Sequence, residues 1–93
     1  MSTTTWIVGA DVGWVSDLTT EAVYVALLPL EPALVLDGTA HVIWHAAIDG
    51  GNLEDVVHAV SAAAGVDTDV VRDETRAFLD DLVSRGLLRR LDA

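Results

Sequence analysis

The spacing of hydrophobic residues changes once along this chain, at Asp37-Gly38, and this change restricts the possible folds more than any other feature. Before it, short runs rich in β-branched and aromatic residues are separated by turn signals, a pattern typical of strands. After it, apolar residues recur every three or four positions, which is typical of amphipathic helices. The sequence therefore predicts an α+β fold in which strands come first and helices follow.

Three strands are expected in the first part of the chain. Their ranges are Trp6 to Val15, Ala22 to Leu28 and Ala33 to Leu36. Pro29 and Pro32 bracket the connection before the third strand, and proline cannot donate a hydrogen bond to a sheet, so Ala33 is expected to begin that strand. Because the third strand is so short, we expect it to lie at an edge of the sheet.

Three helices are expected in the second part, each followed by glycine, which readily adopts the left-handed conformation of a helix end. The first runs from Thr39 to Ile48, the second from an Asn52 cap to Gly65, and the third from a cap at Asp67 or Thr68 to Arg85-Gly86. Leu87-Leu88 is then expected to be a small apolar tail. The order predicts a winged helix-turn-helix-like fold (βββααα), a three-stranded antiparallel sheet followed by three helices, with residues 1–93 as a single domain and residues 1–5 flexible.

Charge excludes some partners. Fifteen Asp and Glu against five Lys and Arg give a net charge of -10, which repels nucleic acid and acidic lipid and is compatible with a basic or neutral peptide. An acidic surface that only keeps the domain in solution is an equally good interpretation. The chain has no cysteine and no run of about 18 apolar residues, so we expect a cytoplasmic protein without a membrane span.

Residues for catalysis or for a cofactor are not evident in this sequence. His41 and His45 have the spacing of two metal ligands on a helix, with His58 further along, but Val42 stands where a zinc protease has its Glu. We expect these histidines to lie at the surface or between helices, with no metal, no cofactor and no enzymatic activity.

Each of the three tryptophans has its own expected position. Trp44 is expected in the core and Trp14 in strand packing, whereas Trp6 is expected in a loosely held tail or a dimer contact.

Three segments of the chain together resemble the PqqD-like family. They are VYVAL (residues 23–27), LVLDGTAHVIW (residues 34–44) and FLDDLVSRGLL (residues 78–88). The resemblance extends from Val23 to Leu88, about two thirds of the chain. That family supplies the precursor-recognition domains of ribosomal peptide natural-product pathways, so the resemblance implies a non-catalytic protein that binds a precursor's leader peptide.

The resemblance also implies a binding mode, in which the leader peptide adds as an extra strand to the third strand and lies in the groove between it and the third helix (Val70 to Arg85). The implied peptide-binding residues are Ala33, Leu34, Val35, Leu36, Val71, Glu74, Thr75, Phe78 and Asp81. Leader side chains would be buried against Val35, Val71, Thr75 and Phe78. Glu74 and Asp81 could pair with a basic leader residue. The stripe formed by Val71, Phe78 and Leu82 is equally typical of a helix face that packs on the core.

The resemblance implies two partners: the leader peptide and a separate modifying enzyme, which could be a radical SAM protein, a leader peptidase or a cyclase. The chain could be a monomer or a homodimer. Two alternatives remain open, a winged-helix DNA-binding transcription regulator and a small homodimeric interaction subunit. The third helix argues against DNA because its Arg72, Arg76 and Arg85 stand among five acidic residues.

Overall fold

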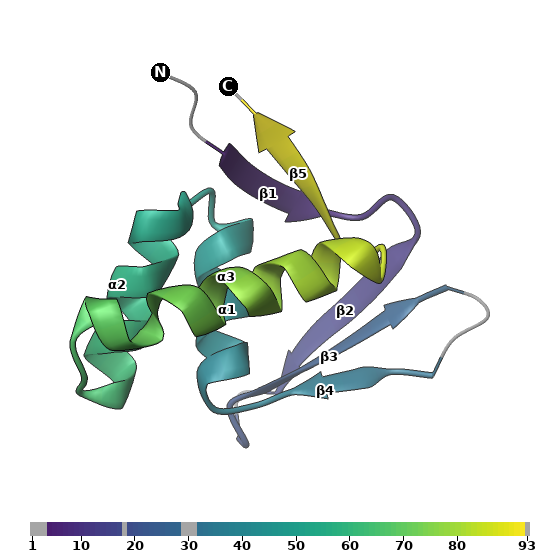
Figure 1. The fold of residues 1–93 in the computed structure, drawn as a ribbon. Coiled ribbons are helices and arrows are strands. Elements are labelled where there is room, and N and C mark those ends of the chain that lie inside the picture. Colours follow the sequence, from purple (N-terminus) through teal and green to yellow (C-terminus); the bar gives the residue numbers. More distant parts are fainter. Residues whose placement is uncertain (1–3, 18, 29–31, 93) are drawn as a thin grey trace.

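The computed structural model describes residues 4–17, 19–28 and 32–92 of the chain (Figure 1). Its elements, in order, are β1 (Thr4–Val8), β2 (Val12–Asp17), β3 (Ala22–Leu27), β4 (Leu34–Leu36), α1 (Thr39–Ile48), α2 (Leu53–Ala64), α3 (Thr68–Ser84) and β5 (Leu88–Asp92). Strands β2, β3 and β4 form a three-stranded antiparallel sheet in that order, and three helices follow, which confirms the predicted winged helix-turn-helix-like class.

The helices begin and end at the positions predicted from their cap residues and glycines. Asn52 caps α2 in a reciprocal arrangement: its side chain accepts from the Asp55 N–H at 2.9 Å, and the Asp55 carboxylate accepts from the Asn52 N–H at 3.1 Å. Gly65 ends α2 in the left-handed conformation, and Gly86 has a positive φ after α3. Asp67 occupies the cap position of α3 but makes no side-chain capping bond.

The predicted first strand is wrong as a single element, because the chain turns at Gly9 and divides it into β1 and β2. The Gly9 N–H donates to the Leu87 carbonyl at 3.0 Å, and the Val12 N–H donates back to the Gly9 carbonyl at 3.3 Å. Strand β1 therefore leaves the three-stranded sheet and pairs with β5 in a separate antiparallel ribbon (Figure 1).

The expected apolar tail at Leu87-Leu88 is also wrong. Both side chains are buried, and Leu88 begins β5. Only the first position of β5 is buried and the others are exposed, so this strand lacks the alternation from which a strand is predicted. Its pairing partner, β1, lies at the other end of the sequence.

Trp6 is not a loosely held tail, since only 5% of it is exposed. Its strand neighbours Thr4 and Thr5 belong to β1, which corrects the expected flexibility at those positions, and the Thr4 hydroxyl donates to the Asp92 carboxylate at 2.7 Å. The same expectation for residues 1–3 lies outside the described residues, as do Pro29 and the residues 30 and 31.

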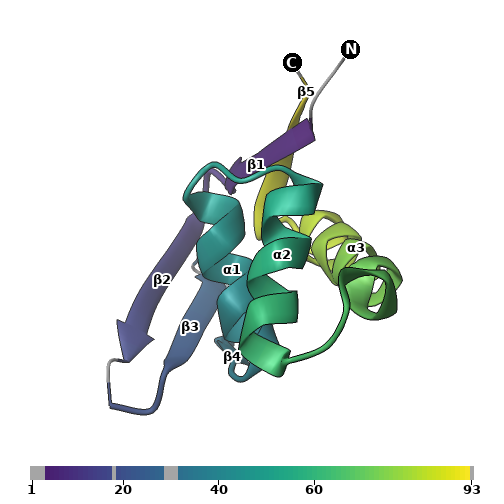
Figure 2. The same ribbon diagram turned by 90° about the vertical axis from the view of Figure 1, so that its left-hand side faces the viewer.

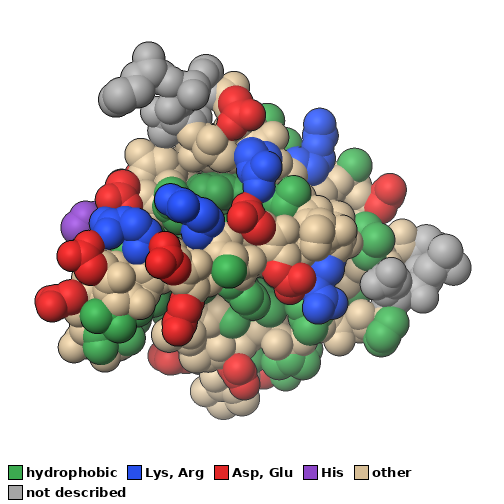
Figure 3. Space-filling model, in the orientation of Figure 1, with side chains coloured by type: hydrophobic (Ala, Val, Ile, Leu, Met, Phe, Trp, Pro, Cys, Tyr) green, Lys and Arg blue, Asp and Glu red, His purple; other side chains and the backbone are tan. Residues whose placement is uncertain are grey.

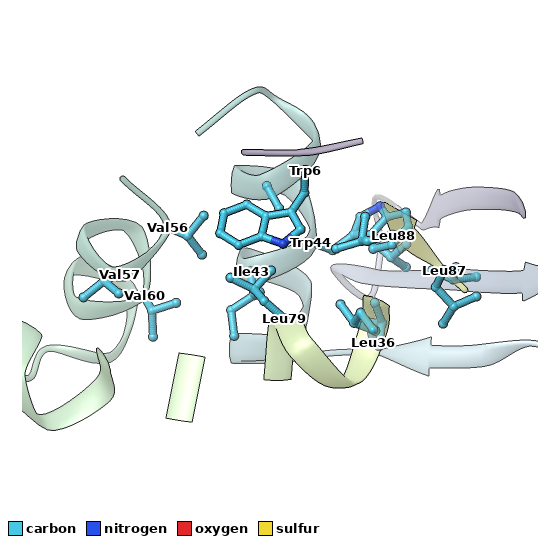
Figure 4. Close-up of a cluster of buried hydrophobic side chains, with 14 of the residues drawn as sticks. Trp6, Leu36, Ile43, Trp44, Val56, Val57, Val60, Leu79, Leu87 and Leu88 are labelled. Atoms are coloured by element: carbon cyan, nitrogen blue, oxygen red, sulfur yellow. The ribbon is translucent and has the colours of Figure 1, made fainter. Parts of the chain in front are cut away.

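The core lies around α1, which stands between the β2–β3 hairpin on one side and α2 and α3 on the other (Figure 2). Trp44 of α1 is fully buried, as predicted, and side chains from both sheets and all three helices surround it (Figure 4). Trp14 packs edge-on against Trp44 with ring centroids 5.9 Å apart, which confirms its predicted strand-packing position. None of the helices in the described part of the chain combines the length and the apolar character needed to cross a membrane.

Candidate functional site

The hydrogen-bond direction of each β3 residue follows from one bond at the end of the β2–β3 hairpin. The Leu28 N–H donates to the Asp11 carbonyl at 2.8 Å, which makes this a hydrogen-bonded pair. Such pairs alternate along an antiparallel ladder, so the Val15 and Tyr24 pair, four residues along, is also hydrogen-bonded. The N–H and C=O of Tyr24 therefore point toward β2, and those of its neighbours in β3 point toward β4.

Strand β4 consequently presents one residue's backbone to its open edge. Val23 and Val25 of β3 pair with Leu36 and Leu34, and these are the positions that bond to β4. The N–H and C=O of Val35 therefore point away from β3. No strand in the described part of the chain pairs with this edge, because the first residues pair with β5 instead. The edge can accept another extended chain.

The side chains of β4 alternate between two faces of the sheet. Leu36 is buried in the core, and Leu34 packs against it on the side of the helices. Val35 is 49% exposed and lies beside Tyr24 on the opposite face. The sequence-based expectation that the Val35 side chain lines one groove with Val71 and Phe78 is therefore wrong, and it is the backbone of Val35 that faces the open edge.

Helix α3 packs mainly on α2 and β5, and a pocket opens beside it. This pocket of about 270 Å³, called here the large pocket because it is larger than the second pocket described below, is lined by Thr39, Ala40, Ile43, Val60, Val71, Glu74, Thr75 and Phe78. Its walls come from all three helices, and most of its lining side chains are apolar. It can accept one sizeable apolar side chain.

A second pocket, of about 180 Å³, lies at the other end of α3. This small pocket is lined by Val25, Leu27, Pro32, Ala33, Leu34, Arg85 and Leu87. The small pocket lies between Arg85, at the end of α3, and the segment that contains β4, whereas the large pocket lies between α3 and the start of α1, three residues after β4. We call the surface that joins them the β4–α3 groove, and Figure 3 shows hydrophobic side chains exposed along it between α3 and β4.

The predicted α3 residues divide between groove and core. Val71 and Thr75 line the large pocket and are also buried, so each contributes both to the pocket wall and to the packing of α3. Phe78 is half-buried in the pocket, while Leu82 lies wholly in the core. Glu74 is exposed at the pocket rim.

Asp81 has a partner in its own helix. The Arg85 guanidinium donates to its carboxylate at 2.9 Å, one turn along α3. Asp81 lines neither pocket, whereas Arg85 lines the small one. The structure therefore brings Glu74 to the groove but leaves Asp81 paired beside it.

Sequence reasoning missed the contribution of α1 and α2 to the large pocket. Thr39, Ala40 and Ile43 lie at the start of α1, just after β4, and Val60 comes from α2. The signal was present in the sequence, because a helix that begins three residues after an edge strand places its first turn beside the end of that strand. Arg85, which lines the small pocket, was expected from the sequence only as the end of the third helix.

All five Lys and Arg residues lie in α3, at its C-cap or in β5. Arg72 is the first Lys or Arg in the chain, and Figure 3 shows the arginines over these two elements with acidic side chains between them. Arg72 binds Glu54 at 2.8 Å and Asp69 at 2.7 Å, and Arg90 binds Asp80 at 2.6 Å. The outer surface of α3 thus carries both positive and negative side chains, unlike the basic helix that binds DNA phosphates.

The two α1 histidines lie away from the groove, toward β2. The rings of His41 and His45 are 4.6 Å apart, and His45 also contacts Trp14 and lies 3.5 Å from the Ser16 hydroxyl. Among the described residues, no three or more potential ligands gather around a common point for a metal ion.

Comparison with known proteins adds two similarities. The family model described as Coenzyme PQQ synthesis protein D (PqqD) matches residues 24–88. A solved structure described as TbiB1 in complex with the TbiA(beta) leader peptide matches with a TM-score of 0.78 and 25% sequence identity, over 89% of this chain and 94% of that one. Curated protein sequences give no significant match.

Proposed function

This chain belongs to the PqqD family, and on that basis we propose that it binds the leader region of a ribosomally synthesised precursor peptide and delivers it to a modifying enzyme. The family is one of non-catalytic peptide-binding proteins, and the similar TbiB1 structure holds a leader peptide. The observation that carries the proposal is the open edge of β4, which lies beside two pockets that extend along α3.

Backbone pairing alone cannot provide the affinity. Val35 offers one N–H and one C=O, and each hydrogen bond contributes only about 0.5–1.5 kcal/mol net. A micromolar complex requires about 8 kcal/mol. One leader side chain buried in each pocket adds about 1.5–3 kcal/mol. The pockets therefore select the leader, and the β4 edge aligns it.

The edge geometry defines which leader residues enter the groove. A leader residue paired with Val35 directs its side chain to the face of the sheet away from the helices, where Val35 also points. The residues on either side of it point toward α3 and the pockets. The leader should therefore present apolar side chains two positions apart, so an alanine scan of the leader should show alternating sensitivity.

The enzyme that receives the precursor would be a radical SAM protein, a leader peptidase or a cyclase, each of which acts on a peptide held by its leader. Capture of a ribosomal product before export would occur in the cytoplasm, which fits the absence of cysteine. A single copy has a complete groove, so we propose that the monomer binds one leader.

Titration of a synthetic leader peptide, from the precursor encoded beside this chain's gene, tests the proposal by calorimetry. We expect saturable 1:1 binding. Val35→Pro removes the N–H that faces the open edge and should weaken binding at least tenfold, with the fold retained because that N–H makes no bond to β3. Ser16→Pro is the matched control, since its N–H faces the opposite open edge of the same sheet.

Two results would contradict the proposal. Absence of binding to the leader would reject the function itself. Loss of binding in Ser16→Pro together with retention in Val35→Pro would keep the function and assign the leader to β2. Thermal unfolding of both variants shows whether the sheet survives.

A further inference from the structure

The three-stranded sheet has a second surface, the face that points away from the helices, called here the outer face. By strand register, Val15, Tyr24 and Val35 form one row across it. Val15 is 64% exposed, and Leu28, further along β3, is 57% exposed. A β-carbon on Gly13 would lie 3.0 Å from the Leu28 side chain, so Leu28 folds over Gly13 on this same face. The outer face therefore has an apolar centre.

Acidic residues flank this centre at both ends of β2. Asp11 and Asp17 lie at the two ends of β2. Each is an even number of positions from Val15, so its side chain lies on the same face, the outer face. The backbone N–H of Thr19 donates to the Asp17 carboxylate at 2.8 Å and lowers its pKa, which favours the charged form. No Lys or Arg precedes Arg72 in the chain, so no basic side chain of these strands offsets the charge.

We propose that the outer face docks the enzyme that processes the captured precursor, through a surface on that enzyme with an apolar centre and a basic rim. This inference depends on the proposed function only for the identity of the occupant. Contiguous exposed apolar surface on a small protein marks an interaction site, and complementary charge at its rim directs the encounter.

A second copy of this chain fits the outer face poorly. A symmetric dimer would place the same patch against itself and bring Asp11 and Asp17 of one copy near those of the other. With a net charge of -10 on each copy, that arrangement is repulsive. The arginines that could offset the repulsion lie on α3 and β5.

The outer face is also continuous with the leader site. A leader strand added beyond β4 extends the row formed by Val15, Tyr24 and Val35, because the residue paired with Val35 directs its side chain to this face. An enzyme docked there would contact the protein and the bound precursor together. The leader-bound form should therefore bind the enzyme more tightly than the free form does.

A charge introduced at the centre tests the docking. The probe is the purified enzyme that modifies or cleaves the same precursor, and its affinity is measured by biolayer interferometry with and without leader. Val15→Glu should weaken enzyme binding about tenfold or more, which corresponds to losing one buried valine contact. Val70→Glu is the matched control, because Val70 is also 64% exposed but lies on α3. Asp11→Lys should weaken binding and reduce its dependence on salt.

Leader affinity, measured in parallel, separates this inference from the proposed function. Val15 lies on β2, two strands from the leader edge, so leader affinity should not change in Val15→Glu. Unchanged enzyme binding in Val15→Glu would overturn the docking surface even if the leader still binds. Wild-type protein that sediments as a dimer, and Val15→Glu that sediments as a monomer, would assign the outer face to a second copy instead.

Discussion

The backbone of Gly9 lies so close to the carbonyl oxygen of Gly86 that a β-carbon at position 9 would overlap with it. This contact joins the turn between β1 and β2 to the end of α3, where the Gly9 N–H also donates to the Leu87 carbonyl at 3.0 Å. It fixes the point at which the first strand leaves the three-stranded sheet. The two glycines thus hold the ribbon formed by β1 and β5 against the rest of the fold.

Gly9→Ala should lower the free energy of unfolding by about 1–3 kcal/mol, since the added methyl group requires the backbone of one of the two glycines to shift. Ala10→Gly, at the next position of the turn, where the side chain is exposed, should cost less than about 1 kcal/mol. Urea unfolding of both variants measures the difference. Equal stabilities would show that the contact with Gly86 is not close in solution.

Phe78→Ala should raise the Kd for the leader about tenfold, because Phe78 is a half-buried wall of the large pocket and its ring is lost from the interface. Phe78→Leu should restore most of the affinity. Val70→Ala, an equivalent truncation on α3 outside the pocket, should leave the Kd unchanged. If both alanine variants bind equally well, the leader does not use this pocket.

Trp6→Ala should cost about 3–5 kcal/mol of stability, as for other buried tryptophans. Trp6→Phe should cost much less, because the indole N–H of Trp6 has no hydrogen-bond partner among the described residues and no bond is lost with it. Thermal unfolding distinguishes the two variants. If Trp6→Ala is as stable as the wild-type protein, Trp6 does not contribute to the core.

Glu54→Gln should destabilise the protein at pH 7 and make less difference near pH 3. Hydrogen bonds from Arg72, at 2.8 and 3.1 Å, lower the pKa of Glu54 in the folded state. A folded-state pKa below the unfolded value gives stability that is present at neutral pH and is lost as the pH falls below about 4.3, the usual Glu pKa.

Thermal unfolding at both pH values, with Arg72→Gln and the double variant, checks this coupling. The double variant should be no less stable than Arg72→Gln, since Arg72→Gln already removes the ion pair with Glu54 together with the one with Asp69. A Glu54→Gln variant as destabilised at pH 3 as at pH 7 would contradict the prediction.

The helices could be predicted from the sequence because local signals punctuate them. The cap at Asn52 and the glycines at positions 65 and 86 depend only on neighbouring residues, and the structure uses all three. The division of the first strand could not be predicted in the same way. Val8, Ala10, Val12 and Trp14 keep an alternating pattern through the turn, and the pairing of β1 depends on β5 at the far end of the chain.

The candidate site shows the same division between local and distant information. The edge position of β4 was predictable from its length and from the preceding proline, and the β4–α3 groove followed from the family resemblance. The direction of the Val35 side chain was not, because it depends on the register of β4 against β3. The pairing of Asp81 with Arg85 depends on side-chain rotamers, which spacing alone leaves undetermined.

The pairing of Thr4 with Asp92 brings the two ends of the described chain side by side, at the end of the ribbon far from β4 (Figure 1). A linker of a few residues would therefore close the chain into a ring, and the ring could be reopened at the exposed turn between α1 and α2. In such a circular permutant the order of the elements would change, but all the residues that line the β4–α3 groove would keep their places. We therefore expect the permutant to bind the leader as the original chain does, because binding would depend on the folded surface and not on the order of the elements.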